Sequence, residues 1–145
     1  MVMWYDAKEV AKYIITVCFT KNILISNLQL QKMLYFLWVE YWKKNNRKLF
    51  LEEFCAWPLG PVIPDVYYEY CSYAGRAIAE YYETSIAEDD KKVLYDVILK
   101  YAYLTASQLV DMTHKEGGAW DTVYQNGKGN RNVIPFELII AKEAS

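Results

Sequence analysis

The side chains that most often carry out catalysis are few in this sequence and are not grouped. Its 145 residues include one histidine, His114, and three cysteines, Cys18, Cys55 and Cys71. A single histidine excludes a histidine-rich zinc site, and neither H-E-x-x-H nor a paired C-x-x-C motif is present. An enzyme would need a pair such as Cys55 as nucleophile and His114 as base. Because the carboxylates are also dispersed, we expect no catalytic residue, no metal and no cofactor.

Phosphate-binding patterns are equally scarce. The sequence contains neither a G-x-x-x-x-G-K-[ST] loop nor a G-x-G-x-x-G motif. Its one basic run, "KKNNRK", supplies Lys43, Lys44, Arg47 and Lys48 as the alternative for nucleic-acid binding. We interpret this run as a solvated helix end, because the formal net charge of -2 gives no general attraction to phosphate backbones. Nucleic-acid binding is therefore the weaker hypothesis.

The cysteine count and the absence of long apolar runs indicate a cytoplasmic protein. Three cysteines are an odd number, and no charged-then-apolar leader precedes a small-residue cleavage site. No apolar run approaches the ~20 residues that span a bilayer. We expect reduced thiols and no membrane association. Cys18 and Cys71 should be buried, since each lies on the apolar side of a predicted helix.

Apolar residues recur at helical spacing through most of the chain. Asp6 with Glu9 has the spacing of a capping box, an Asp variant, and predicts a helix that ends near Thr20. Ser26 or Asn27 can cap a central helix of about four turns. Further helices are predicted from Pro64 to near Gly75, from Glu88 or Asp89 to Tyr103, from Thr105 or Ser107 to Met112, and from Pro135 to Ile140, with one turn around 120–124.

The β content should be small. Two short apolar runs, 49–51 and 54–57, are separated by two glutamates and favour a hairpin. Residues 76–90 fit either an extended stretch or a short helix. With no repeat and no linker, residues 1–145 are expected to form one domain: a compact, mainly α helical bundle with a small β-hairpin element.

One stretch, "AWPLGPVIPDVYYEY" at 56–70, combines rigidity with aromatic side chains. Gly60 permits a tight turn, and Pro61 and Pro64 fix their own φ angles, so Tyr67 is presented at a defined angle. The chain as a whole is 17% aromatic with 14 tyrosines, a residue type enriched where a surface meets a partner. The corner either joins a hairpin to a helix around a buried Trp57 or forms part of a binding surface.

Four segments resemble the Panacea domain, a phage-associated family, in order and spacing. They are "DAKEVAKYII", "ISNLQLQKMLYFLWVEYW", "FCAWPLGPVIPDVYYEY" and "LVDMTHKEGGAW". The resemblance covers most of the chain. The family often has a proline where this chain has Ala119. The residues that carry the pattern, structural or partner-binding, are Trp57, Gly60, Pro61, Val62, Pro64, Tyr67, Thr113, His114 and Trp120.

The resemblance implies an antitoxin that neutralises a co-encoded toxin, often in a prophage, by direct protein contact. The alternative that it implies is a proteolytic adaptor, which delivers a toxin or another client to a protease. Its cognate toxin would be the main partner, with Tyr67, Tyr68, Tyr81 and Tyr82 on the contacting surface. A homodimer is a second use for an exposed aromatic face.

Overall fold

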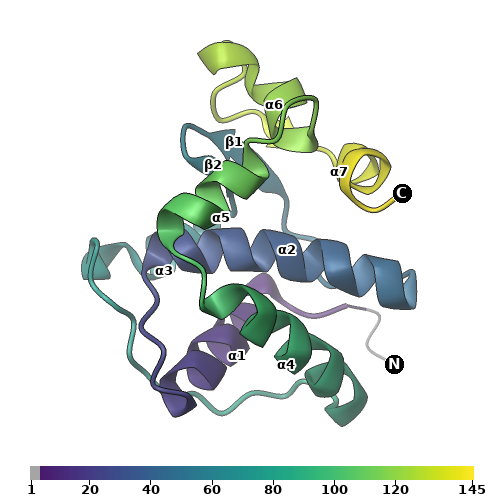
Figure 1. Ribbon diagram of the computed structural model, residues 1–145. Coiled ribbons are helices and arrows are strands. Elements are labelled where there is room, and N and C mark those ends of the chain that lie inside the picture. The colour runs from purple at the N-terminus through teal and green to yellow at the C-terminus, as the bar shows by residue number, and fades with distance from the viewer. Residues whose placement is uncertain (1–3) are drawn as a thin grey trace.

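The fold is organised around one long helix, α2 (Asn27–Asn45), which crosses the middle of the molecule (Figure 1). The computed structural model describes residues 4–145. In this part of the chain the other helices are α1 (Ala7–Thr20), α3 (Pro64–Glu69), α4 (Glu88–Ala102), α5 (Ala106–Thr113), α6 (Ala119–Tyr124), α7 (Phe136–Glu143) and the 3-10 turns η1 (Cys71–Tyr73) and η2 (Gln125–Gly127). The prediction of a mainly α fold is confirmed.

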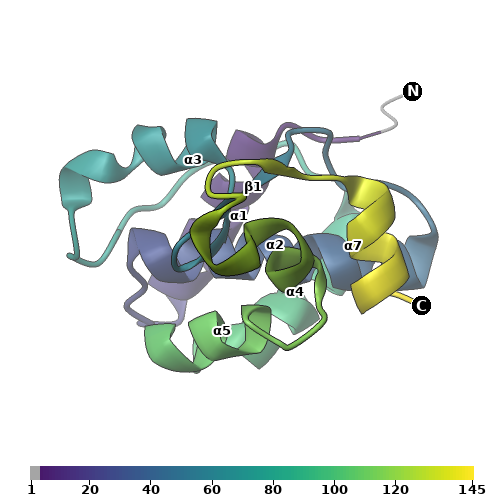
Figure 2. The ribbon, with the colours of Figure 1, turned by 90° about the horizontal axis from the view of Figure 1, so that it is seen from above.

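Helix α2 is enclosed on nearly all sides. Every residue from Leu30 to Tyr35 in its middle is buried. Helices α1 and α4 pack on one side of it, and the small sheet, α6 and α7 lie on the other (Figures 1 and 2). A helix surrounded in this way belongs to a core and not to a surface. Trp38 and Phe136 stack at 4.6 Å between ring centroids, which fixes α7 on α2.

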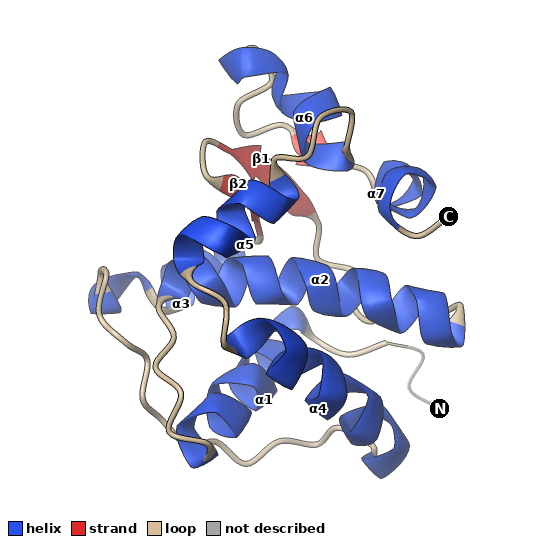
Figure 3. Cartoon of the chain, viewed as in Figure 1, coloured by secondary structure: helices blue, strands red, loops and turns tan. Residues whose placement is uncertain are grey.

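The sheet has three short strands in the order β2-β1-β3, all pairs antiparallel (Figure 3). They are β1 (Phe54–Trp57), β2 (Gly60–Val62) and β3 (Val133–Ile134). The prediction that residues 49–51 and 54–57 pair in a hairpin is wrong. Phe50 is buried in an isolated parallel bridge to Tyr5, and β1 turns back instead through the two residues that precede Gly60.

The helix caps agree with the sequence at two places and differ at a third. Ser26 and Thr105 each form a complete capping box, with Gln29 and Gln108. The Asp6 side chain makes no cap hydrogen bond. Its role is taken by Glu52, whose Oε2 accepts from the backbone N–H of Ala7 at 2.9 Å.

Other predictions near residues 70–90 need correction. Helix α3 ends at Glu69 and is followed by a single 3-10 turn, so the helix predicted to reach Gly75 is too long. Residues 76–87 contain no helix or strand. Cys18 is buried as expected, but Cys71 is exposed because it lies beyond the end of α3. No helix in residues 4–145 is both long and apolar enough to cross a membrane.

The caps give a direct test. Replacing Ser26 by Ala should lower the free energy of unfolding by about 1 kcal/mol, because the first turn of α2 loses a bonded N–H. Asp6→Ala should change it by less than about 0.5 kcal/mol, since this side chain caps nothing. Chemical denaturation measures both values. Equal losses would show that Asp6 is a cap in solution.

Candidate protein-binding surface

The candidate site is built on a sharp reversal of the chain, residues 57–68, called the corner below. Trp57 pairs with Gly60 across the two-residue loop Pro58–Leu59, and Ala56 pairs with Pro61. Pro64 then opens α3 at a position where proline costs no hydrogen bond. The hairpin and the helix are therefore joined by only one residue, Ile63, which is buried.

Lys32 of α2 reaches the corner from inside the protein. The side chain is fully buried, and its Nζ donates to the carbonyl of Pro61 at 2.9 Å. No described carboxylate lies within 4 Å of it. Burial lowers the pKa of Lys32 from 10.5 to about 7, because the charged amine is poorly solvated there. Burial therefore favours the uncharged amine relative to an exposed lysine.

Two more polar side chains of α2 bind the backbone of the corner. The backbone N–H of Ile63 donates to Gln31 Oε1 at 3.0 Å, and Asn27 Nδ2 donates to the carbonyl of Tyr67 at 3.0 Å. Gln31 Nε2 also donates to Asn27 Oδ1, so the pair forms one network. Both amides are buried. Asn27, Gln31 and Lys32 together, the polar row of α2, hold the hairpin and α3 at fixed positions.

Gly60 is the point of closest approach between the hairpin and its neighbours. Its φ is +117°, and a Cβ built there would lie 2.6 Å from Thr113 Oγ1 and 2.7 Å from Lys32 Cε. Any larger residue would push β2 away from α2 and α5. The sequence pattern that joined Gly60 and Thr113 thus reflects a contact in space.

Trp120 and His114 support the corner from α6 and the end of α5. Trp120 Nε1 donates to the carbonyl of Trp57 at 2.8 Å. The His114 ring stacks on Trp120 at 3.8 Å, and its buried Nε2 has no hydrogen-bond partner among residues 4–145. Within the described part of the chain, the contact of this side chain is therefore ring stacking and not a hydrogen bond. Burial, followed by the charge of Lys32, lowers the pKa of His114 below 6.5.

The outer face of the corner is aromatic and open to solvent. The Trp57 ring lies 5.0 Å from Tyr67 and 6.3 Å from Tyr68, measured between centroids. Tyr68 is 55% exposed and Leu59 is 53% exposed. Beside them a groove of about 280 Å³ opens between α2, the hairpin and α3. Trp57, Tyr67, Tyr68 and Leu59, the aromatic face below, thus share one surface.

The second pair of predicted contact residues lies apart from this face. Tyr82 is tied to α1, because its N–H donates to Thr16 Oγ1 at 2.8 Å and its carbonyl accepts from the same hydroxyl. Tyr81 is 58% exposed. No described contact joins Tyr81 or Tyr82 to Tyr67 or Tyr68. The structure brings together the first pair only.

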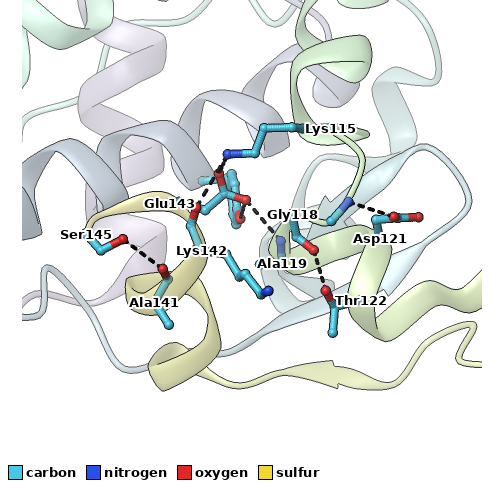
Figure 4. Close-up of polar contacts among 11 residues, drawn as sticks. Lys115, Gly118, Ala119, Asp121, Thr122, Ala141, Lys142, Glu143 and Ser145 are labelled. Carbon is cyan, nitrogen blue, oxygen red and sulfur yellow. Dashed lines mark hydrogen bonds and ion pairs between the residues drawn. The ribbon is translucent and has the colours of Figure 1, made fainter.

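Ala119 opens α6 at a position where the resemblance to the Panacea domain implies a proline. Figure 4 shows the Glu143 carboxylate between Lys115 and the start of α6. Glu143 Oε2 accepts from the backbone N–H of Ala119 at 3.1 Å, and Oε1 accepts from Lys115 Nζ at 2.9 Å. Tyr35 of α2 donates to the same carboxylate at 3.2 Å. Proline has no N–H to donate, so alanine permits this link between α6 and α7.

The residues named for other functions do not assemble into sites. Burial, followed by the charge of Glu53, raises the pKa of the Cys55 thiol, which disfavours the thiolate that a nucleophile needs. Residues 4–145 contain no group of three or more His, Cys, Asp or Glu side chains that could hold a metal ion. Lys43 and Lys44 are exposed at the end of α2, but Arg47 is paired with Asp90 at 3.6 Å.

Sequence reasoning missed the polar row of α2. Its signal was present: Asn27 and Gln31 are four residues apart, and Lys32 stands between the apolar Leu30 and Met33. Helical periodicity alone does not distinguish such residues from polar residues on the solvent side. A polar residue in a helix that is apolar around most of its circumference is instead a candidate for buried hydrogen bonding.

Gly60 can be tested against a matched glycine. Gly60→Ala should lower the free energy of unfolding by about 3 kcal/mol, through the strained φ and the contacts with Thr113 and Lys32. Gly75→Ala is the control, because nothing lies within 4 Å of its added Cβ. Urea unfolding measures the difference. Equal stability of the two variants would mean that the hairpin is not held tightly against α2.

The buried lysine predicts a pH dependence of stability. Because the folded pKa of Lys32 is depressed to about 7, the unfolded chain binds more protons between pH 7 and 10.5. Lys32 therefore makes the free energy of unfolding rise with pH in this window, by up to about 1.4 kcal/mol per unit. Lys32→Met should remove this rise, and Lys44→Met on the exposed end of α2 should retain it. An unchanged profile in Lys32→Met would contradict the burial of a titrating amine.

Comparison with known proteins identifies the family of this chain. The family described as "Antitoxin SocA-like, Panacea domain" matches residues 30–121, which include the hairpin, α3, α5 and Trp120. The protein named Antitoxin SocA from Caulobacter vibrioides (strain NA1000 / CB15N) is 33% identical, with 86% of this chain and 72% of the relative covered. No solved structure gives a significant match. The chain therefore belongs to the SocA-like Panacea-domain family.

Proposed function

We propose that this protein is a cytoplasmic, non-enzymatic antitoxin that binds a toxin encoded beside it and masks the toxin by direct contact. The observation that carries the proposal is the aromatic face, which is exposed at Tyr68 and Leu59 although buried hydrogen bonds fix the backbone beneath it. The name of the relative, Antitoxin SocA, supports the role in general. The contact surface is the corner, and Tyr68 is its most accessible aromatic ring.

The backbone of the corner is preorganised for binding. A partner that docks on a flexible loop must order the backbone as it binds, and this entropy cost reduces affinity. At the corner the polar row of α2 already restrains the backbone at Pro61, Ile63 and Tyr67. Rigid tyrosine and tryptophan rings near the centre of an interface are frequent hot spots. A small number of such rings suffices within an interface of standard size, about 1,600 Å².

The neutralisation can be tested by growth. A bacterial culture that expresses the neighbouring open reading frame should stop growing, and co-expression of this chain should relieve the arrest. Tyr68→Ala should weaken binding to the purified toxin by about 2 kcal/mol, a roughly thirtyfold rise in Kd. Tyr103→Ala is the matched control, since Tyr103 is a 70% exposed tyrosine at the end of α4.

These experiments test the antitoxin role and the corner as the contact surface independently. Relief of arrest with equal affinity for wild type, Tyr68→Ala and Tyr103→Ala would keep the antitoxin role and reject the corner as the contact. No arrest in the absence of this chain would reject the antitoxin role. A toxin whose half-life shortens when this chain is present, in a protease-dependent manner, would identify an adaptor and reject masking.

A further inference from the structure

We infer that the groove of the corner binds an acidic segment of the partner, with one apolar or aromatic side chain in the groove and carboxylates at its rim. This inference rests on the proposed function, because it specifies the chemistry of the same surface. It follows from the lining of the groove and from two arginines beside it.

The groove itself is apolar. Trp57, Pro58, Leu59 and Tyr67 form the corner side, and Leu28 and Ala74 contribute from α2 and from the end of η1. Its volume, about 280 Å³, lies at the lower limit of small-ligand pockets and suits one large side chain. The amides of Asn27 and Gln31 also border it, but they are already bonded to each other and to the corner. The groove therefore offers contact area more than unfilled hydrogen bonds.

An arginine stands over the aromatic ring at the hairpin side of the groove. The guanidinium carbon of Arg131 lies 4.5 Å from the centroid of Trp57. The Arg131 backbone N–H donates to the carbonyl of Ala56 at 2.6 Å, which fixes the arginine to the hairpin. The residue is exposed. A guanidinium in this position keeps its outer N–H groups available to a carboxylate.

A second arginine lies close to Ala74, which lines the groove. Arg76 comes two residues after Ala74, and its side chain donates to the carbonyls of Tyr73 and Ser72 at 3.3 Å. Neither Arg76 nor Arg131 forms an ion pair with a described acidic residue. Glu69 of α3 is directed elsewhere, to Lys8 of α1 at 3.5 Å. The chain carries a net charge of -2, yet these two arginines near the groove have no ion-pair partner among the described residues, so charge complementarity favours an acidic partner segment.

The test uses two fluorescein-labelled 12-residue peptides and needs no toxin. Both contain the same central phenylalanine, flanked by glutamates in one peptide and by lysines in the other. Fluorescence polarisation at 50 mM salt should give at least tenfold tighter binding of the acidic peptide. The double variant R76E/R131E should reverse this preference. The double variant K43E/K44E, which changes the net charge equally at the exposed end of α2, should retain it.

Equal binding of the two peptides, no binding of either, or the same reversal in K43E/K44E would overturn the inference. Circular dichroism and thermal unfolding of each variant confirm that the fold is intact. The proposed antitoxin function is tested independently of the acidic segment. If the toxin binds R76E/R131E as tightly as wild type, the antitoxin role survives and the acidic segment is rejected.

Discussion

Lys32 donates from the interior to the carbonyl of Pro61, and most of the candidate surface depends on that bond and its two neighbours. A short hairpin of three or four residues per strand is not stable by itself in water. Here the hairpin is fixed because buried side chains of α2 bond to the backbone of β2 and of the residues that come after β2. Burying a lysine without a carboxylate is costly, and the depressed pKa of about 7 records that cost. An interaction of this kind is better explained by the position it imposes than by the stability it adds.

The corner is also held from the other side of the sheet. Trp120 bonds to the carbonyl of Trp57, and the helix that carries Trp120 is tied to α7 and α2 through Glu143 (Figure 4). Gly60 has no room for a side chain, because Thr113 and Lys32 occupy the space beside it. Residues distant in sequence thus converge on one backbone segment. This convergence gives a physical reason why the family pattern joins the hairpin to the Thr113, His114 and Trp120 segment.

The sequence predicted the helices well because their apolar spacing and caps are local signals, as at Ser26 and Thr105. The predictions from the sequence were wrong where a residue distant in sequence makes the contact that was expected of a nearby residue. Glu52 caps α1 in place of Asp6, and the hairpin forms across Pro58–Leu59 instead of across the two glutamates. At the site, four residues of the family pattern meet in pairs, Trp57 with Trp120 and Gly60 with Thr113. Lys32 and Arg131 could not be found in this way, since only the fold shows that one is buried and the other lies over a ring.

We propose that the rigid corner is the surface that a toxin covers. Hydroxyl-radical footprinting of this chain, free and bound to the product of the neighbouring open reading frame, tests it most directly, because it reports side-chain exposure. Oxidation of Leu59 and Tyr68 should fall at least several-fold in the complex, while oxidation of Tyr103 and Met112, exposed on α4 and α5, stays unchanged. Protection of Tyr103 or Met112 with undiminished oxidation of Leu59 and Tyr68 would contradict the claim and place the contact on another face.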